Sequence, residues 1–143
     1  MADAEKDLWP SDLGLGKTVT PVSILRTQAT LLSQKTQGIL EGAVETGTAG
    51  LDIYHRFVIV VPLLGNYRYP LFKVRRTGEL YPVYVDEEPR PVDRRTGLRD
   101  PGPVDALLLA DERQFREWLR SMLSSDATKQ IIANLYAQAS TAA

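Results

Sequence analysis

His55 is the residue best suited to acid–base chemistry, because the chain has no other histidine and no cysteine. A lone histidine acting as a general base needs a carboxylate that orients its ring, which Asp52 or Glu79 could supply. Nearby cations would stabilise negative charge on a phosphate-bearing substrate: Arg56, Arg68 or Lys73. A single histidine on an apolar strand face is more often a packed, hydrogen-bonded residue. A phosphate-ester hydrolase or transferase using His55 is therefore an alternative, and no catalytic residue is assigned.

Residues 11–21, SDLGLGKTVTP, contain the residue types of a phosphate-binding loop. Gly-Leu-Gly-Lys-Thr resembles the core of helicase motif I of the Swi/Snf type. A nucleotide-binding loop also requires an earlier glycine, where this chain has Ser11, a preceding hydrophobic strand and a helix that follows at once. The preceding residues are acidic, and Pro21 interrupts the helix that should follow. We therefore predict no nucleotide cofactor at this stretch.

The acidic run at residues 86–88 contains carboxylates of the kind that hard cations prefer. Consecutive carboxylates at the end of a strand point in different directions, and the spacing of a calcium loop is absent. The sequence therefore predicts a solvated loop start and no metal site.

Tyrosine and arginine alternate in YRYPLFKVRR, residues 67–76, and tyrosines return in ELYPVYV, residues 79–85. Interleaved aromatic and basic side chains can stack bases and hold phosphates, and the same residue types dominate protein interfaces. We predict a binding surface on the outer face of the 67–85 hairpin together with the loop at 86–103. Its residues are Tyr67, Arg68, Tyr69, Arg75, Arg94 and Arg95.

Composition limits the classes of function. The chain has 143 residues, 43% of them hydrophobic, and its net charge is −1. This length suits a single domain over 1–143, and the near-neutral charge favours a protein partner over nucleic acid. The longest apolar run, residues 57–64, is far shorter than the roughly 20 residues that cross a bilayer. We expect no membrane partner and a cytoplasmic location.

The predicted elements begin after an irregular arm at 1–19, whose apolar residues we expect to dock on the body. Thr20 and Pro21 are a typical helix start, and the helix should end near Gly38. A weak edge strand at 39–45 and a small-residue turn at 47–50 follow.

Three strands are predicted at 52–61, 67–75 and 80–85, with hairpin turns at Gly65-Asn66 and Thr77-Gly78. Pro70 and Pro82 place bulges or edges in the later strands. A Pro- and Arg-rich loop spans 86–103, and a short fifth strand is expected within 104–109. Asp111 should cap a helix that buries Phe115, Trp118, Leu119 and Met122, and a second helix should begin near Asp126.

These elements predict an α+β domain: an antiparallel meander of four to five strands, packed by an N-terminal helix and a C-terminal helix pair. The favoured function is that of a non-catalytic protein-binding module, such as a small accessory, adaptor or immunity-type subunit. A nucleic-acid-binding domain using the Tyr/Arg-rich hairpin is a further alternative. Self-association through an edge strand and exposed tyrosines is also expected to be feasible.

Overall fold

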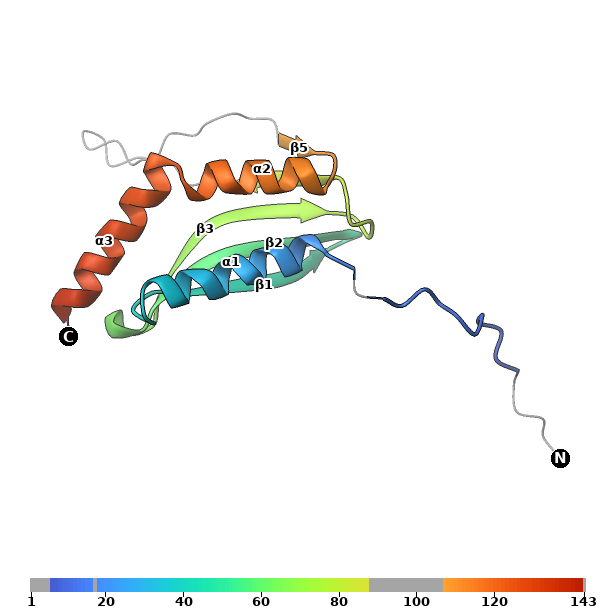
Figure 1. Cartoon of the computed structure of the whole chain (residues 1–143), viewed down its shortest axis with the longest axis horizontal. Coiled ribbons are helices and arrows are strands. Elements are labelled where there is room, and N and C mark those ends of the chain that lie inside the picture. The colour runs from blue at the N-terminus through green and yellow to red at the C-terminus, as the bar shows by residue number, and fades with distance from the viewer. Residues whose placement is uncertain (1–5, 17, 88–106, 143) are drawn as a thin grey trace.

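The computed structural model describes residues 6–16, 18–87 and 107–142, and Figure 1 shows their arrangement. One helix precedes a five-stranded sheet, and two helices follow it. The strand order is β1-β2-β3-β4-β5, with every neighbouring pair antiparallel. The chain is thus an α+β meander, as the sequence predicts.

Helix α1, Pro21–Lys35, begins where the sequence predicts, because Thr20 and Ser23 form a capping box. The Thr20 hydroxyl accepts the Ser23 N–H at 3.1 Å, and the Ser23 hydroxyl accepts the Thr20 N–H at 2.9 Å. After the helix, Gln37 and Gly38 both adopt positive φ, and the Gly38 N–H donates to the Ser33 carbonyl at 2.8 Å. This left-handed pair turns the chain from α1 into the sheet.

Strand β1, Glu41–Ala49, is longer than the predicted edge strand and pairs along its whole length with β2, Asp52–Val61. The predicted turn at 47–50 is therefore wrong: the chain reverses at Gly50, where φ is 63°, and at Leu51. Gly47 remains in the strand because the Tyr54 ring occupies the space where a Cβ of residue 47 would lie. An aromatic ring over a strand glycine compensates for the missing side chain.

Strand β3, Tyr67–Arg76, follows the short 3-10 helix η1, Pro62–Leu64. The register between β2 and β3 shifts where Phe72 pairs with Phe57 and Pro70 pairs with Val58, so Leu71 is the extra residue of a bulge. The bulge places Leu71 and Phe72, two consecutive residues, in the core. The expected irregularity at Pro70 is confirmed.

Strands β4, Val83–Glu87, and β5, Leu107–Leu109, complete the sheet. Strand β4 starts later than the predicted 80–85, because Pro82 has no N–H to donate to a neighbouring strand and stands outside β4. The fifth strand is confirmed at 107–109, whereas residues 104–106 of the prediction lie outside the described part. The predicted 86–103 loop also falls outside it, apart from its first two residues, which belong to β4.

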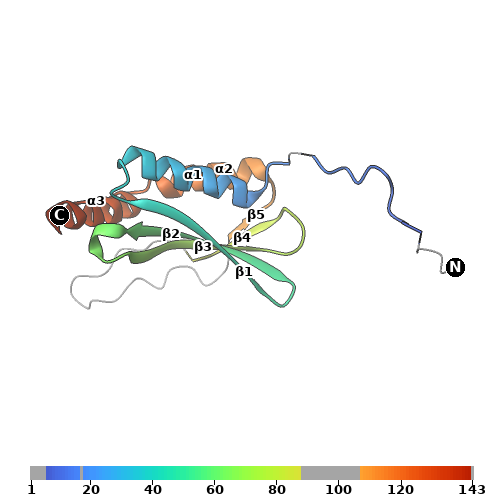
Figure 2. The same ribbon diagram turned by 90° about the horizontal axis from the view of Figure 1, so that it is seen from below.

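Helices α1 and α2, Glu112–Leu123, lie over the same face of the sheet, as Figure 2 shows, and their buried residues form one core with that face. Helix α2 is capped by Asp111 and buries the four residues that the sequence predicts. Phe115 packs edge-on against Tyr81, and Trp118 packs edge-on against Phe72. The rings of Phe115 and Trp118 are tilted relative to each other. Helix α3, Asp126–Ala142, buries Thr128, Leu135 and Ala139.

The N-terminal arm, which we define as residues 6–16 and 18–20, does not dock on the body. It leaves the start of α1 and extends away from the helices (Figure 1). Leu8 and Trp9 are 85% and 75% exposed, so the expected docking of the arm's apolar residues is wrong. Among the helices of the described residues, none has the length and apolarity that a membrane span requires.

Candidate functional site

The environment of His55 is that of a structural residue. Its ring is 1% exposed and lies on the helix-covered face of β2. Arg76 Nε donates to Nε2 at 3.2 Å, and Thr46 Oγ1 lies 2.9 Å from Nδ1. Because a guanidinium can only donate, Nε2 is the acceptor, and Nδ1 carries the hydrogen that is donated to Thr46.

Burial of the His55 ring, together with the charges of Arg76 and Arg26, lowers its pKa from 6.5 to about 4. The imidazole is therefore neutral at pH 7, and both of its nitrogens are occupied within the protein. Neither Asp52 nor Glu79 orients the ring through a side-chain contact in the described part: Asp52 lies near Arg75, and Glu79 uses its carbonyl to accept from Arg76. This arrangement gives no support to a hydrolase or transferase built on His55.

The glycines of residues 11–21 belong to the arm, with no strand before them in the described residues. Gly14 has a φ of 70°, and its N–H donates to Asp12 Oδ1 at 2.8 Å. Lys17 lies outside the described residues. The context that a nucleotide-binding loop requires is therefore absent from the part of the arm that the structure describes.

The predicted Tyr/Arg surface is divided between the two faces of the sheet. Arg68 and Arg75 lie on the face away from the helices, which we call the far face. Tyr67 and Tyr69 pair with Val61 and Ile59 and so lie on the helix-covered face. Tyr69 packs against the core there, while Tyr67 is half exposed. The predicted Arg94 and Arg95 fall outside the described residues.

The far face carries cations that are engaged with neighbours of their own chain. Arg75 forms an ion pair with Asp86 at 3.2 Å, approaches Asp52 at 3.9 Å and lies 4.6 Å from the centroid of the Tyr84 ring. Lys73 lies 4.9 Å from the centroid of the Tyr54 ring. These contacts give Arg75 and Lys73 partners within the chain before any ligand arrives.

Carboxylates are distributed among the same cations. Arg68 forms an ion pair with Glu45, and the β3–β4 register sets Glu87 opposite Lys73. A surface that binds nucleic acid concentrates positive charge, because neutralising phosphates supplies most of its affinity. The alternating charges of the far face do not provide such a field, and Asp86 forms an ion pair with Arg75. No group of three or more potential metal ligands is found within the described part.

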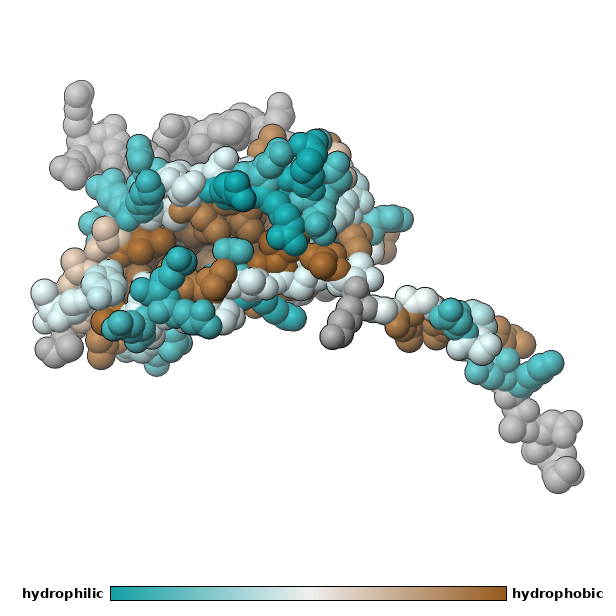
Figure 3. Space-filling model, viewed as in Figure 1, coloured by the Kyte–Doolittle hydropathy of each residue, from teal (hydrophilic) through white to brown (hydrophobic). Residues whose placement is uncertain are grey.

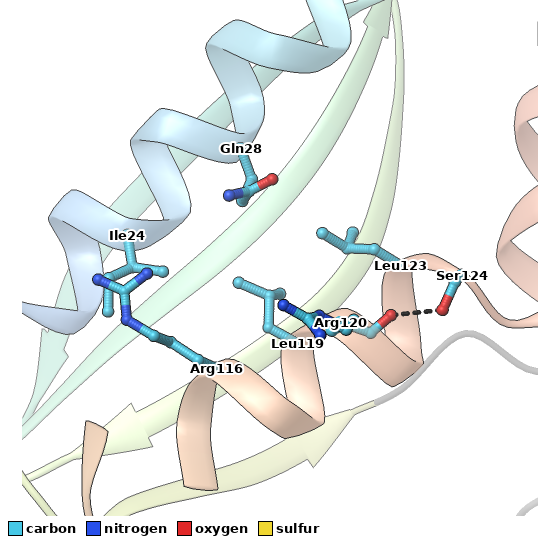
Figure 4. Close-up of a pocket in the computed structure, with 7 residues that line it drawn as sticks. All are labelled: Ile24, Gln28, Arg116, Leu119, Arg120, Leu123 and Ser124. Carbon is cyan, nitrogen blue, oxygen red and sulfur yellow. Dashed lines mark hydrogen bonds between the residues drawn. The ribbon is translucent and has the colours of Figure 1, made fainter. Parts of the chain in front are cut away.

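A groove between the helices is the most distinctive surface of the described structure. It consists of two neighbouring hollows that share Gln28 and Leu123, and we call it the interhelical groove. The first hollow, of about 450 Å³, lies between α1 and α2 (Figure 4). Its lining residues are Ile24, Gln28, Arg116, Leu119, Arg120, Leu123 and Ser124.

The second hollow, of about 230 Å³, continues along α1 to α3 and is deeper toward the sheet. Phe57, Ile59 and Leu71 of the core line it. Its remaining lining residues come from the helices: Gln28, Leu31, Leu32, Lys35, Leu123 and Ile132. Figure 3 shows the resulting apolar strip between hydrophilic helix surfaces.

Basic side chains stand at the groove. Arg116 is paired with Glu112 at 3.2 Å, whereas Arg120 and Lys35 have no ion-pair partner within the described part of the chain. Leu31 is 37% exposed at the second hollow. The groove thus offers an apolar floor with unpaired cations beside it, which suits a segment that is apolar with acidic neighbours.

Sequence reasoning missed this groove, although its residues carry recognisable signals. The apolar stripe of α1 includes Leu31 and Leu32, so it is wider than the stripe that would pack against the sheet alone. On α2, Arg116 and Arg120 stand one turn apart. The spacing between α1 and α2 that turns these features into a groove is set by tertiary packing. The chain matches no protein-family model, and no curated protein or solved structure shows significant similarity to it.

Proposed function

We propose that this chain is a non-catalytic protein-binding module whose binding site is the interhelical groove. The observation that carries the proposal is the groove's floor, where Phe57, Ile59 and Leu71 of the core line a hollow between two helices. Apolar grooves of this kind receive helical or extended peptide segments through a few anchor side chains.

The chemistry of the partner follows from the groove. Apolar anchors would fill the two hollows, and carboxylates beside them would meet Arg120 and Lys35. Opposite charges at the rim steer association and select against basic segments, while the buried anchors supply most of the affinity. The partner is therefore a protein segment in which apolar residues are flanked by aspartate or glutamate.

A selection from a displayed library of random peptides tests this proposal. Immobilised wild-type chain should enrich peptides with apolar anchors and acidic flanks. The enriched peptides should lose binding to Leu31→Asp, which places a carboxylate on the α1 side of the second hollow, and bind Arg120→Glu more weakly. Because both side chains are exposed at the groove, the variants are expected to fold.

Arg68→Ala on the far face is the matched control and should retain the enriched peptides. If no peptide is enriched, or if the enriched peptides bind Leu31→Asp as well as the wild type, the groove is not the binding site. Loss of binding in Arg68→Ala would instead support the surface predicted from the Tyr/Arg pattern.

A further inference from the structure

The N-terminal arm presents a row of apolar side chains that the body of the same chain leaves uncovered. The arm extends away from the helices, and Figure 3 shows hydrophobic residues along it. Exposure is high at its five large apolar residues: Leu8 (85%), Trp9 (75%), Leu13 (50%), Leu15 (86%) and Val19 (48%). Several large apolar side chains in one exposed segment indicate a binding element.

The arm has the composition that the interhelical groove requires. Residues 1–20 of the sequence carry four carboxylates against two lysines: Asp3, Glu5, Asp7 and Asp12 against Lys6 and Lys17. Asp7 and Asp12 alternate with the apolar residues. The groove carries Arg120 and Lys35 without carboxylate partners in the described residues. An apolar arm with an excess of carboxylates and an apolar groove with unpaired cations are complementary in both hydrophobicity and charge.

The arm is long enough to reach the groove of a neighbouring molecule. Residues 8–20 can span about 40 Å when extended. The α1 wall from Ile24 to Lys35 is about 17 Å long. Half of the arm can therefore cross between two molecules while the other half fills the groove.

The direction of the arm favours a second molecule over its own. Thr20 is extended, with φ −108° and ψ 159°, and the capping box with Ser23 fixes its backbone at the start of α1. The arm leaves this point away from the helices (Figures 1 and 2). Binding within the same chain would require the arm to reverse its direction before α1, whereas a neighbouring groove can be entered along the direction in which the arm extends (Figure 1).

We propose that the interhelical groove binds the N-terminal arm of a second copy of this chain, and that two chains exchange arms around a two-fold axis. Each chain then supplies one arm and one groove, as a closed two-fold dimer requires. This inference rests on the proposed function, because it names the segment that the groove binds. Trp9 is the largest apolar side chain of the arm and the principal anchor.

Sedimentation equilibrium of the full-length chain tests the proposal. The wild type should show a concentration-dependent monomer–dimer equilibrium. Trp9→Ala in the arm and Leu31→Asp in the groove should each raise the dimer dissociation constant at least about tenfold, as loss of an interface anchor does. Arg68→Ala on the far face should leave the dimer unchanged.

Mixing the two defective variants makes the test specific for exchange. Trp9→Ala keeps an intact groove and Leu31→Asp keeps an intact arm, so their mixture should form a heterodimer through one intact arm–groove contact. This heterodimer should be more stable than either variant's homodimer. No association on mixing would overturn the exchange.

A fluorine NMR measurement follows the arm itself. In chain labelled with 5-fluorotryptophan, the Trp9 signal, assigned with Trp9→Phe, should shift with protein concentration, while the signal of Trp118 in the core stays constant. A monomeric wild type overturns the proposal, whether Trp9 is solvent-exposed or bound within its own chain. A dimer that persists in Leu31→Asp also overturns it, because association then uses another surface.

These outcomes separate the two proposals. If library peptides bind the groove while the wild type stays monomeric, the groove is a binding site for another protein and only the arm exchange fails. If no peptide requires the groove and the wild type is monomeric, both proposals fail.

Discussion

Arg76 donates a hydrogen bond of 3.2 Å from Nε to Nε2 of His55, which places a permanent cation against a fully buried imidazole. The bond connects the end of β3 to β2, and the Thr46 hydroxyl of β1 forms the second hydrogen bond to the ring, at Nδ1. Three strands are thus joined through one ring. The role of the histidine is to hold the sheet, and this role makes folding sensitive to pH.

Protonation of His55 is expected to destabilise the fold. The folded-state pKa of about 4 lies below the unfolded value of 6.5, so the unfolded chain binds the proton first as the pH falls. The stability that neutral His55 contributes to the fold is fully present above pH 6.5 and is lost progressively as the pH falls to about 4. This lowering of the pKa corresponds to a loss of about 3 kcal/mol in the free energy of unfolding.

Urea unfolding across this pH range measures the effect. His55→Gln keeps an acceptor for Arg76 and a donor for Thr46 but cannot titrate. It should be less stable than the wild type at pH 7 and show a shallower decline of the unfolding free energy toward pH 4. Equal slopes in the two proteins would mean that His55 is not the group responsible.

Gly42 allows α1 to approach β1. A Cβ at this position would lie 2.5 Å from the Ala29 Cα and 2.7 Å from the Ala29 carbonyl oxygen, so the helix backbone would have to move. Gly42→Ala should lower the free energy of unfolding by about 1–3 kcal/mol, the usual cost of overpacking. Gly78→Ala is the matched control, since a Cβ there meets open space. Thermal denaturation that fails to separate the two variants would contradict the close approach.

The Tyr81 hydroxyl is buried without a hydrogen-bond partner among the described residues, while its ring packs edge-on against Phe115. Burial, with the charge of Glu112, raises the pKa of this phenol. Removing an unpartnered hydroxyl should cost nothing, so we expect Tyr81→Phe to be neutral or to stabilise the fold by up to about 1 kcal/mol. A clear loss of stability in urea unfolding would show that the hydroxyl has a bonding role.

The fold could be predicted because its signals are local. Thr20-Pro21, Asp111 and the Gly65-Asn66 pair mark boundaries through caps and turns, and the structure places element ends at each of them. The end of β1 could not be predicted in this way. Gly47 resembles a turn residue, and only the Tyr54 ring on the neighbouring strand explains why it continues the sheet.

The candidate site was harder to predict, because strand alternation determines which side chains share a face of the sheet and the spacing of the helices determines whether a groove forms. Tyr67, Arg68 and Tyr69 are consecutive, so a strand sends the arginine to one face and the tyrosines to the other. The groove brings together Leu31, Leu71 and Ile132, from three elements that are far apart in the sequence. Only the tertiary arrangement places them around one hollow.

Calorimetric titration of a library-selected peptide into wild type, Leu31→Asp and Arg68→Ala tests the central claim most directly. If the interhelical groove is the binding site, the wild type and Arg68→Ala will bind with the same affinity and Leu31→Asp will bind at least about tenfold more weakly. Equal affinity for wild type and Leu31→Asp, with loss in Arg68→Ala, would contradict the claim and place binding on the far face of the sheet.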